Sequence, residues 1–135
     1  MNIAFIGTGK LGLPCAEEIA KVGHSVTGYD PACVKSDGTY STTNNLIDLK
    51  HSIAEAVKFA KIVFVAVPTP HDPSYDGRAP TAHLEPRDFN YDIVKDVLRE
   101  CDAVMNPAQM IVLISTVLPG TVRRELHPLV THTRF

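Results

Sequence analysis

Short apolar runs alternate with amphipathic stretches along this chain. Residues 2–6 (NIAFI), 62–67 (IVFVAV) and 110–115 (MIVLIS) are almost wholly apolar and predict strands, with IVFVAV the clearest buried strand. Residues 25–30 (SVTGYD) form a further candidate strand, in which apolar and polar residues alternate less cleanly than in a half-buried strand, so we expect it to be buried on both faces. Strands separated by helical segments predict βαβ units and therefore a mainly parallel sheet.

The segments between these strands carry helical spacing. Residues 10–22 place apolar side chains at intervals of three or four, on one face of a helix (Leu11, Cys15, Ile19 and Val22). Pro14 falls in the first turn, where a missing N–H costs nothing, and Gly23 lies where a left-handed cap ends a helix. Ser52 begins SIAE, a capping-box sequence that predicts a helix over about residues 53–60.

The rest of the chain is less regular. Residues 91–104 carry an apolar helical stripe (Ile93, Val97, Cys101 and Val104), and residues 119–126 (PGTVRREL) begin another helix. Residues 31–51 are polar, and only a short strand at 39–43 is expected there. Residues 71–90 are rich in proline and predict a long surface loop, and loops of that length are usually functional or disordered.

Composition narrows the class of protein. The 135 residues are 44% hydrophobic, as expected for a single domain with a real core. A net charge of −2 without blocks of like charge argues against nucleic acid as a partner. Three cysteines without metal-binding spacing suggest reduced thiols, and no signal peptide or 18-residue apolar run is present. We therefore expect a cytoplasmic protein, not bound to a membrane.

The first chemical motif is GTGKLG (residues 7–12), a GxGxxG sequence between a predicted strand and a predicted helix. Gly7 permits a tight turn, Gly9 lets a pyrophosphate approach the backbone, and Gly12 lets helix and strand pack closely. Asp30 ends the next strand, where a carboxylate accepts hydrogen bonds from ribose hydroxyls and repels a 2′-phosphate. We therefore expect a Rossmann-type, doubly wound α/β fold, with helices on both faces of the sheet, that binds NAD rather than NADP.

The same residues have a simpler interpretation. A glycine turn can link strand to helix without any ligand, and Asp30 would then be a solvated strand end. Lys10 either contacts a phosphate or is solvated. The matching strand, helix and aspartate favour the cofactor site over this alternative.

Two further motifs place hydroxyl groups at the ends of predicted strands. In VPTP (67–70), Pro68 and Pro70 end the strand and stiffen the backbone around Thr69. STVLPGT (115–121) follows the next strand and again holds hydroxyls beside a proline and a glycine. Ligands of open parallel sheets lie outside the carboxyl ends of the strands, where the strand order reverses, so both motifs should face the dinucleotide.

Together these motifs resemble the nucleotide-sugar 6-dehydrogenases, the UDP-glucose and GDP-mannose dehydrogenase family. The matching residues are GTGKLGLP (7–14), Asp30, VPTP (67–70) and STVLPGT (115–121), so the resemblance covers essentially the whole chain. The last two motifs are much more specific than the glycine motif. The family oxidises the C6 primary alcohol of a nucleotide-sugar to a carboxylate, using two NAD per turnover and a cysteine thiohemiacetal and thioester.

The resemblance implies a set of cofactor-binding residues. The glycine motif would bind the pyrophosphate and Asp30 the ribose, and Lys35 sits where the family often has a ribose-contacting lysine. Thr69 and Thr116 would line the reactive end of the cofactor, with Thr116 helping to position a catalytic water. The full expected set is Gly7, Gly9, Lys10, Leu11, Gly12, Asp30, Lys35, Val67, Pro68, Thr69, Ser115 and Thr116.

The chain also departs from the family pattern. The segment between Asp30 and Ser52 looks shorter than in typical members and lacks their Glu-Pro-Gly-Leu stretch. The family's catalytic glutamate, lysine, asparagine and nucleophilic cysteine belong to a linker and a substrate domain that these residues do not include. We therefore expect residues 1–135 to form one NAD-binding domain, inactive alone, which meets the nucleotide-sugar only through the absent domain. A homodimer is a further expectation.

None of the three cysteines is assigned as a nucleophile. Cys15 and Cys101 fall on the apolar stripes of predicted helices, where a thiol acts as a small buried hydrophobe. Cys33 lies in a polar loop near the expected ribose end, which is the wrong place for chemistry at the nicotinamide.

The charged residues of the later loops are interpreted as solvated. His71 and His83 fit no metal motif, so no metal site is expected. Arg123 and Arg124 are assigned to an exposed helix face. The aspartates of the long loop are treated as ordinary loop residues (Asp72, Asp76 and Asp88).

Two other classes of protein remain open. The chain could be the cofactor domain of another NAD-dependent dehydrogenase, such as one that acts on β-hydroxy acids, although the VPTP and STVLPGT motifs argue against it. It could also be a stand-alone nucleotide-binding module without a catalytic partner. Such a module would have to cover its exposed apolar surface, for example by self-association.

Overall fold

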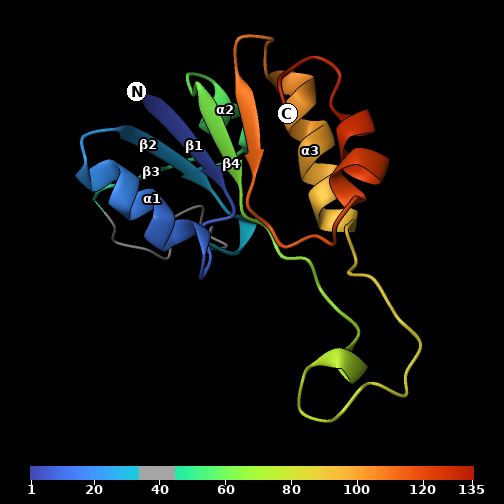
Figure 1. The fold of residues 1–135 in the computed structure, drawn as a ribbon. Helices are drawn as coiled ribbons and strands as arrows, with labels where there is room; N and C mark the ends of the chain where they lie inside the picture. Colours follow the sequence, from blue (N-terminus) through green and yellow to red (C-terminus); the bar gives the residue numbers. More distant parts are fainter. Residues whose placement is uncertain (34–44) are drawn as a thin grey trace.

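Five parallel strands form the centre of the computed structural model, which describes residues 1–33 and 45–135 (Figure 1). Their order across the sheet is β3-β2-β1-β4-β5. From β1 to β3 each strand is added on one side of the sheet, and after β3 the chain crosses to the other side of β1, where β4 and then β5 are added. The α/β fold class predicted from the sequence is confirmed. The strands are β1 (Asn2–Ile6), β2 (Ser25–Tyr29), β3 (Asp48–Leu49), β4 (Ile62–Val65) and β5 (Met110–Leu113).

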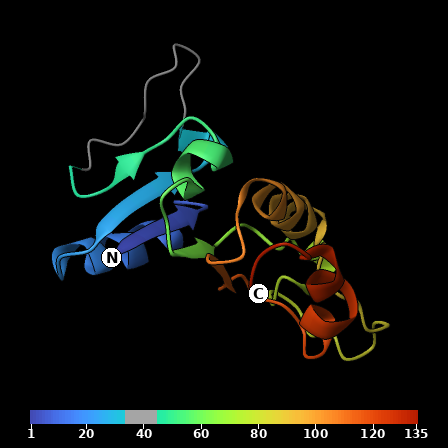
Figure 2. The ribbon, with the colours of Figure 1, turned by 90° about the horizontal axis from the view of Figure 1, so that it is seen from above.

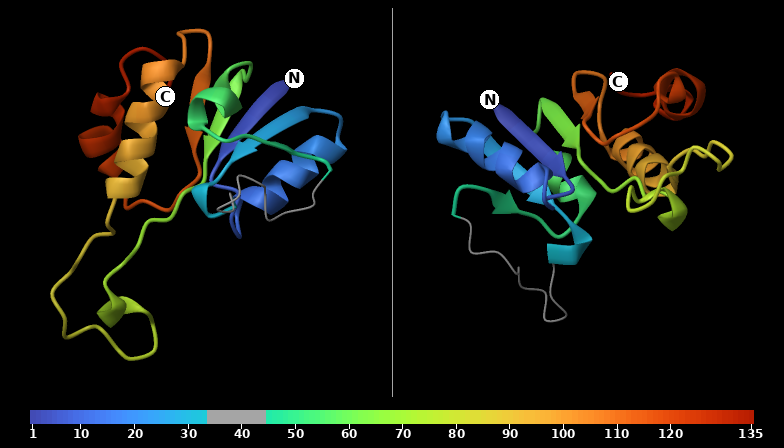
Figure 3. Two further views of the ribbon diagram at one scale, coloured as in Figure 1. Left: turned by 180° about the vertical axis from the view of Figure 1, so that it is seen from behind. Right: turned by 60° about the horizontal axis from the view of Figure 1, so that its bottom comes forward.

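Helices cover both faces of this sheet (Figures 2 and 3). Alternate residues of β1 separate the two layers of the core, because side chains of a strand point to opposite faces in turn. Ile3 and Phe5 pack with α1, whereas Ala4 and Ile6 pack with α2 and α3. The helices are α1 (Gly12–Lys21), α2 (Ile53–Val57) and α3 (Asp92–Val104), with short helical turns η1 (Pro31–Cys33), η2 (Pro73–Tyr75), η3 (Val122–Leu126) and η4 (His127–Leu129).

The buried faces of α1 and α3 differ from the predicted stripes. In α1, the buried residues are Gly12 and Ala16, whereas Leu11 and Val22 at the ends of the predicted stripe are exposed. In α3, Val94, Leu98 and Cys101 are buried, whereas the predicted Ile93 and Val104 are exposed. The prediction was wrong at these ends because several apolar stripes fit each sequence, and only packing against the sheet selects one.

Two shorter elements also differ from expectation. The helix at α2 ends at Val57, and the Ser52 hydroxyl accepts from the Glu55 N–H (3.2 Å) as a cap should. The Glu55 carboxylate, however, accepts from the N–H of His51 instead of Ser52. The sequence pattern missed β3, because this strand has only two residues. The strand predicted at 39–43 lies outside the described residues.

Buried Asp102 of α3 fastens the end of the chain to the fold. Its carboxylate accepts hydrogen bonds from the backbone N–H groups of Thr131, His132 and Thr133 at 2.8 to 3.2 Å. Burial alone would raise the pKa of Asp102, but these donors and the His132 ring hold that pKa well below its usual range. Arg134 then forms a parallel bridge with Met110 at the start of β5.

The predicted loop over residues 71–90 leaves the carboxyl edge of the sheet and extends away from the body (Figures 1 and 3). The structure describes all of these residues, and their only regular element is η2. The N–H of Asn90 donates to the carbonyl of Pro70 (2.7 Å), which closes the base of the loop beside the VPTP motif. Among the described residues, no helix is both long and apolar enough to cross a membrane.

Candidate functional site

The carboxyl ends of β1 and β4 lie side by side at the centre of the sheet, at the lower edge in Figure 1. Strand order reverses between these two strands, since β2 and β3 lie on one side and β5 on the other. The glycine motif follows β1, VPTP begins just after β4, and STVLPGT follows β5. The fold thus gathers all three sequence motifs at the edge where open α/β sheets bind ligands.

Two glycines of the GxGxxG turn are required by the backbone. Gly7 has a φ of +93°, and a Cβ atom on it would lie 2.5 Å from the carbonyl oxygen of Ala66. A Cβ on Gly12 would lie 1.9 Å from the carbonyl oxygen of Gly7. No side chain could replace the hydrogen at either place without moving the chain, because these contacts are with backbone atoms.

Gly9 differs from its two neighbours in the motif. A Cβ on Gly9 would meet no atom of the described residues within 4 Å, and its φ lies outside the left-handed region. Protein packing therefore gives no reason for glycine there. The open space next to the start of α1 is where a Rossmann pyrophosphate would lie, so this position fits a dinucleotide.

Asp30 lies against the glycine turn. Its Oδ2 accepts a hydrogen bond from the backbone N–H of Thr8 (2.9 Å), and its Oδ1 accepts from the N–H of Ala32 (2.9 Å). Thr8 is buried, and its hydroxyl lies 3.6 Å from the Cys33 sulfur. The carboxylate keeps further lone pairs for ribose hydroxyls, because each oxygen can accept two hydrogen bonds.

The amino end of α1 points to this turn. Leu11 is its N-cap, and the described structure contains no side-chain hydrogen bond to the cap. The first turn also has no acidic side chain, so no residue of that turn neutralises the positive end of the helix dipole. Lys10 is exposed beside it, and Lys35 lies outside the described residues. The arrangement favours an anion such as a pyrophosphate.

The two hydroxyl motifs are connected to each other. The Ser115 hydroxyl donates to the carbonyl of Val67 (2.7 Å), so Ser115 joins the two motifs across the strand ends. Pro68 is exposed and Thr69 half-buried, and Thr116 is exposed. Within the part of the chain that the structure describes, the hydroxyls of Thr69 and Thr116 have no hydrogen-bond partner. Both remain available to a ligand.

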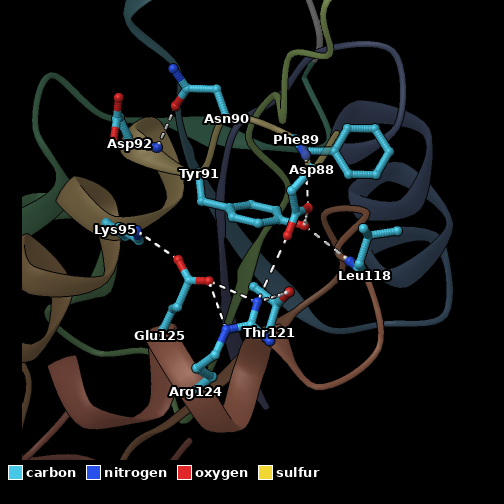
Figure 4. Close-up of polar contacts among 10 residues, drawn as sticks. All are labelled: Asp88, Phe89, Asn90, Tyr91, Asp92, Lys95, Leu118, Thr121, Arg124 and Glu125. Atoms are coloured by element: carbon cyan, nitrogen blue, oxygen red, sulfur yellow. Dashed lines mark hydrogen bonds and ion pairs between the residues drawn. The ribbon is translucent and has the colours of Figure 1, made fainter. Parts of the chain in front are cut away.

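A polar network that the sequence did not reveal lies next to these motifs (Figure 4). The buried Tyr91 hydroxyl donates to the Asp88 carboxylate and accepts from the Leu118 N–H, 3.0 Å away. Arg124 contacts Glu125 at 2.8 Å and lies 3.8 Å from Asp88. Asp88 and Arg124 are exposed, as predicted, but they also belong to this network. The sequence did not reveal the network, since neither polarity nor spacing shows which loop residues the fold brings together.

Other loop charges are paired in the same region. The Lys95 ammonium, 2.9 Å from Glu125, lowers the pKa of that carboxyl group. Asp72 was also expected to be an ordinary loop residue, but it accepts from the Ser74 N–H, which lowers its pKa, and pairs with Arg87 at 2.6 Å. These contacts give the long loop a defined internal structure.

Several hollows lie on the surface of the described residues, and two of them bear on the site. One of about 580 Å³ lies between the loop and α3, and its lining includes His71, Asn90 and Lys95. The other, of about 410 Å³, lies at the amino ends of the strands and contains none of the predicted site residues. The described residues include no cluster of three or more side chains able to hold a metal ion.

The cysteines occupy structural positions. Cys101 is fully buried, and burial raises the pKa of its thiol to about 12, so it is neutral and inert at physiological pH. Cys15 is half-buried in the cluster beneath α1. Cys33 lies beside Thr8, at the Asp30 end of the site. Neither helical cysteine is placed for chemistry at the VPTP or STVLPGT motifs.

The fold and the glycine turn define a dinucleotide-binding domain of Rossmann type. The chain belongs to the UDP-glucose/GDP-mannose dehydrogenase family, as its NAD binding domain, because the model of that family domain matches residues 1–134. The resemblance noted in the sequence is confirmed. The family assignment also identifies NAD as the cofactor of this class of domain.

The curated relatives of this chain are longer proteins that it matches in part. The GDP-mannose 6-dehydrogenase of Pseudomonas syringae pv. tomato is 26% identical over 149 aligned positions, which cover 96% of this chain and 31% of that protein. A D-lactate dehydrogenase of Streptococcus pyogenes is 34% identical over 95 residues, 70% of this chain and 23% of that protein. The chain thus spans between about a fifth and a third of the length of the curated relatives it matches.

Solved structures share the fold. A ternary complex of a Pseudomonas GDP-mannose dehydrogenase superposes with a TM-score of 0.71 at 24% identity, covering 96% of this chain and 32% of that one. A UDP-glucose dehydrogenase from Pyrobaculum islandicum gives a TM-score of 0.67 at 23% identity, covering 99% and 34%. At this identity the likeness concerns the fold alone.

Proposed function

We propose that this chain is the NAD-binding part of an enzyme that oxidises the C6 alcohol of a nucleotide-sugar to a carboxylate, in the cytoplasm. The observation that supports it most is the open position at Gly9, between two glycines that the backbone requires and beside the carboxylate of Asp30. The nucleotide-sugar would be bound by a further domain. Without that domain the chain would bind NAD and turn over nothing, and the full enzyme would act as a homodimer.

The residues of the site would have distinct roles. Gly9, Lys10, Leu11 and the start of α1 would bind the pyrophosphate, since free N–H groups and a positive helix end favour an anion. Asp30, together with Lys35, would bind the adenosine ribose. The reactive end of the cofactor would lie along the motifs after β4 and β5 (Val67, Pro68, Thr69, Ser115 and Thr116).

The chemistry itself would come from bound NAD, which supplies the hydride acceptor. The protein would orient the nicotinamide by the stiff backbone around Thr69, and Thr116 would help to position a water. Ser115 would hold the two motifs together through Val67, as its hydroxyl already reaches that carbonyl.

The first test is calorimetric titration of the chain with NAD and NADP, for the wild type and for Asp30→Asn. The one oxygen of the asparagine can still accept a hydrogen bond from Thr8, whereas the bond from the N–H of Ala32 and the charge are lost. We expect NAD to bind more tightly than NADP, and the variant to lose affinity for NAD by roughly tenfold, the value of a charge-assisted hydrogen bond. Asp96→Asn, an exposed change on α3, is the matched control and should bind as the wild type. A folded chain that binds neither nucleotide would refute the proposal.

A second candidate is suggested by other relatives. A probable 3-hydroxyisobutyrate dehydrogenase of Mycobacterium bovis is 34% identical over 68 residues, half of this chain and 22% of that protein. The family match over residues 1–134 favours the nucleotide-sugar instead. NADH formation by the full-length gene product with UDP-glucose, GDP-mannose or 3-hydroxyisobutyrate distinguishes the two functions. Turnover of the hydroxy acid alone would establish the second.

A further inference from the structure

Tyr91 lies between the two hydroxyl motifs of the proposed cofactor site. On one side, its neighbour Asn90 donates a backbone hydrogen bond to Pro70, the last residue of VPTP. On the other side, its own hydroxyl accepts from the N–H of Leu118, within STVLPGT (3.0 Å). Tyr91, the residue immediately before α3, thus contacts STVLPGT directly and is next to Asn90, which contacts VPTP. Tyr91 itself belongs to neither motif.

The direction of the Tyr91 hydrogen bonds is determined by chemistry. A phenol has one proton, and the Asp88 carboxylate can only accept, so the Tyr91 hydroxyl donates to Asp88. Its oxygen is then left to accept from Leu118. Tyr91 is 4% exposed, so its hydroxyl would be costly to leave without these partners. Asp88 itself is held by Arg124 at 3.8 Å and by the N–H of Phe89 at 2.7 Å (Figure 4).

The same network also holds the far end of STVLPGT. The N–H of Thr121 donates to the carbonyl of Leu118 (3.2 Å), and the hydroxyl of buried Thr121 lies 3.4 Å from the Arg124 guanidinium. Both backbone polar groups of Leu118 are therefore engaged. At the near end, Ser115 is joined to Val67. Exposed Thr116 lies between these two fixed points.

We propose that Tyr91 is a positioning residue for the cofactor site, because its hydroxyl holds Leu118 so that STVLPGT presents Thr116 to the nicotinamide end. The inference rests on the proposed NAD site. It concerns only the part of the site after β5, since the Tyr91 hydroxyl bonds to Asp88 and Leu118 and not to the glycine turn or Asp30. Tyr91 therefore affects binding of the nicotinamide half of NAD and leaves binding of the adenosine and pyrophosphate half unchanged.

The test compares NAD with ADP-ribose, which lacks only the nicotinamide. In Tyr91→Phe, the ring stays buried and both hydrogen bonds are lost. We expect the affinity for NAD to fall by about three- to tenfold, the effect of a lost hydrogen bond, and the affinity for ADP-ribose by less than about twofold. Amide exchange at Leu118 should become faster. Tyr75→Phe is the matched control, since the Tyr75 hydroxyl donates to Glu85 within the loop rather than holding STVLPGT.

The outcomes separate this inference from the proposed function. Equal losses for NAD and ADP-ribose, or no loss for either, would overturn the role of Tyr91 while leaving the NAD site in place. Failure of the folded wild-type chain to bind either nucleotide would overturn the proposed function, and the role of Tyr91 with it. A fall in thermal stability alone, with the ratio of the two affinities unchanged, would show that Tyr91 acts only on the fold and would also overturn the inference.

Discussion

The backbone N–H of Thr8 donates a hydrogen bond of 2.9 Å to the carboxylate of Asp30, 22 residues further along the chain. This contact joins the glycine turn after β1 to the end of β2. The carboxylate expected to bind a ribose therefore also orders the turn expected to bind the pyrophosphate. Substitutions in the motif should separate into those that affect the fold and those that affect the ligand.

Gly9→Ala and Gly12→Ala should have opposite effects on stability and binding. The Cβ atom that Gly9→Ala adds meets open space, so the free energy of unfolding should change by no more than about 0.5 kcal/mol. NAD affinity should fall by roughly tenfold or more, because the methyl group occupies the space left for the pyrophosphate. Denaturant unfolding and calorimetry measure the two effects.

Gly12→Ala should instead destabilise the domain by about 3 kcal/mol or more, since its Cβ would overlap the Gly7 carbonyl. Normal NAD binding by the Gly9 variant would argue against a pyrophosphate at that position. Normal stability of the Gly12 variant would contradict the close packing of α1 on the turn.

Asp102 should make the stability of the domain depend on pH. Its pKa is lower in the folded protein than in the unfolded chain, so its contribution is fully present above the ordinary value near 4. That contribution is lost as the pH falls from about 5 towards the lower folded pKa, because the unfolded chain then binds the proton more readily. Urea unfolding of the wild type at a series of pH values measures this loss.

Asp102→Asn should cost roughly 2–3 kcal/mol at neutral pH, because a buried acceptor of several backbone N–H groups loses its charge. The variant should also lose less stability than the wild type between pH 7 and pH 3. Asp96→Asn, at an exposed position of the same helix, should match the wild type at every pH. Parallel pH profiles for Asp102→Asn and the wild type would contradict this role.

Gln109 should be important for the packing of α2. Its side-chain amide, buried before β5, donates to the carbonyls of Val57 and Ala60, both at 2.7 Å. Gln109→Met keeps the shape of the side chain but leaves these carbonyls without their donor, which should cost about 2 kcal/mol of stability. Gln109→Glu tests whether the side chain acts as the donor. An ionised glutamate cannot donate to the two carbonyls, so this variant should be at least as destabilised as Gln109→Met. A methionine variant as stable as the wild type would show that water replaces the amide.

The thiols should differ in reactivity. Cys101 is fully buried with a pKa of about 12, so iodoacetamide should leave it unmodified in the native protein. Cys15 and Cys33 are only partly buried and should react more quickly. Mass spectrometry of peptides after timed labelling measures the rates, with labelling in urea as the control for full access. Rapid labelling of Cys101 under native conditions would indicate that α3 opens readily.

The sequence by itself determined the class of fold and the location of the motifs. The apolar runs at β1, β4 and β5 are nearly continuous; both faces of β1 are buried, whereas one face of β4 and most of β5 are only half-buried. Gly7 and Gly12 are glycines for reasons of backbone geometry. Such constraints act on neighbouring residues, so they are visible as patterns. The order β3-β2-β1-β4-β5 then places the motifs together, as the general rule for open sheets predicts.

Only the tertiary structure decided which of several possible contacts are made. The two-residue β3 exists because it pairs with β2, and the buried stripe of α3 runs through Leu98 because the sheet lies on that side. Asp88, Tyr91 and Leu118 likewise come together only when the long loop folds back to α3 and STVLPGT crosses it. Contacts between distant residues depend on the path of the whole chain, so no local pattern of the sequence can specify them.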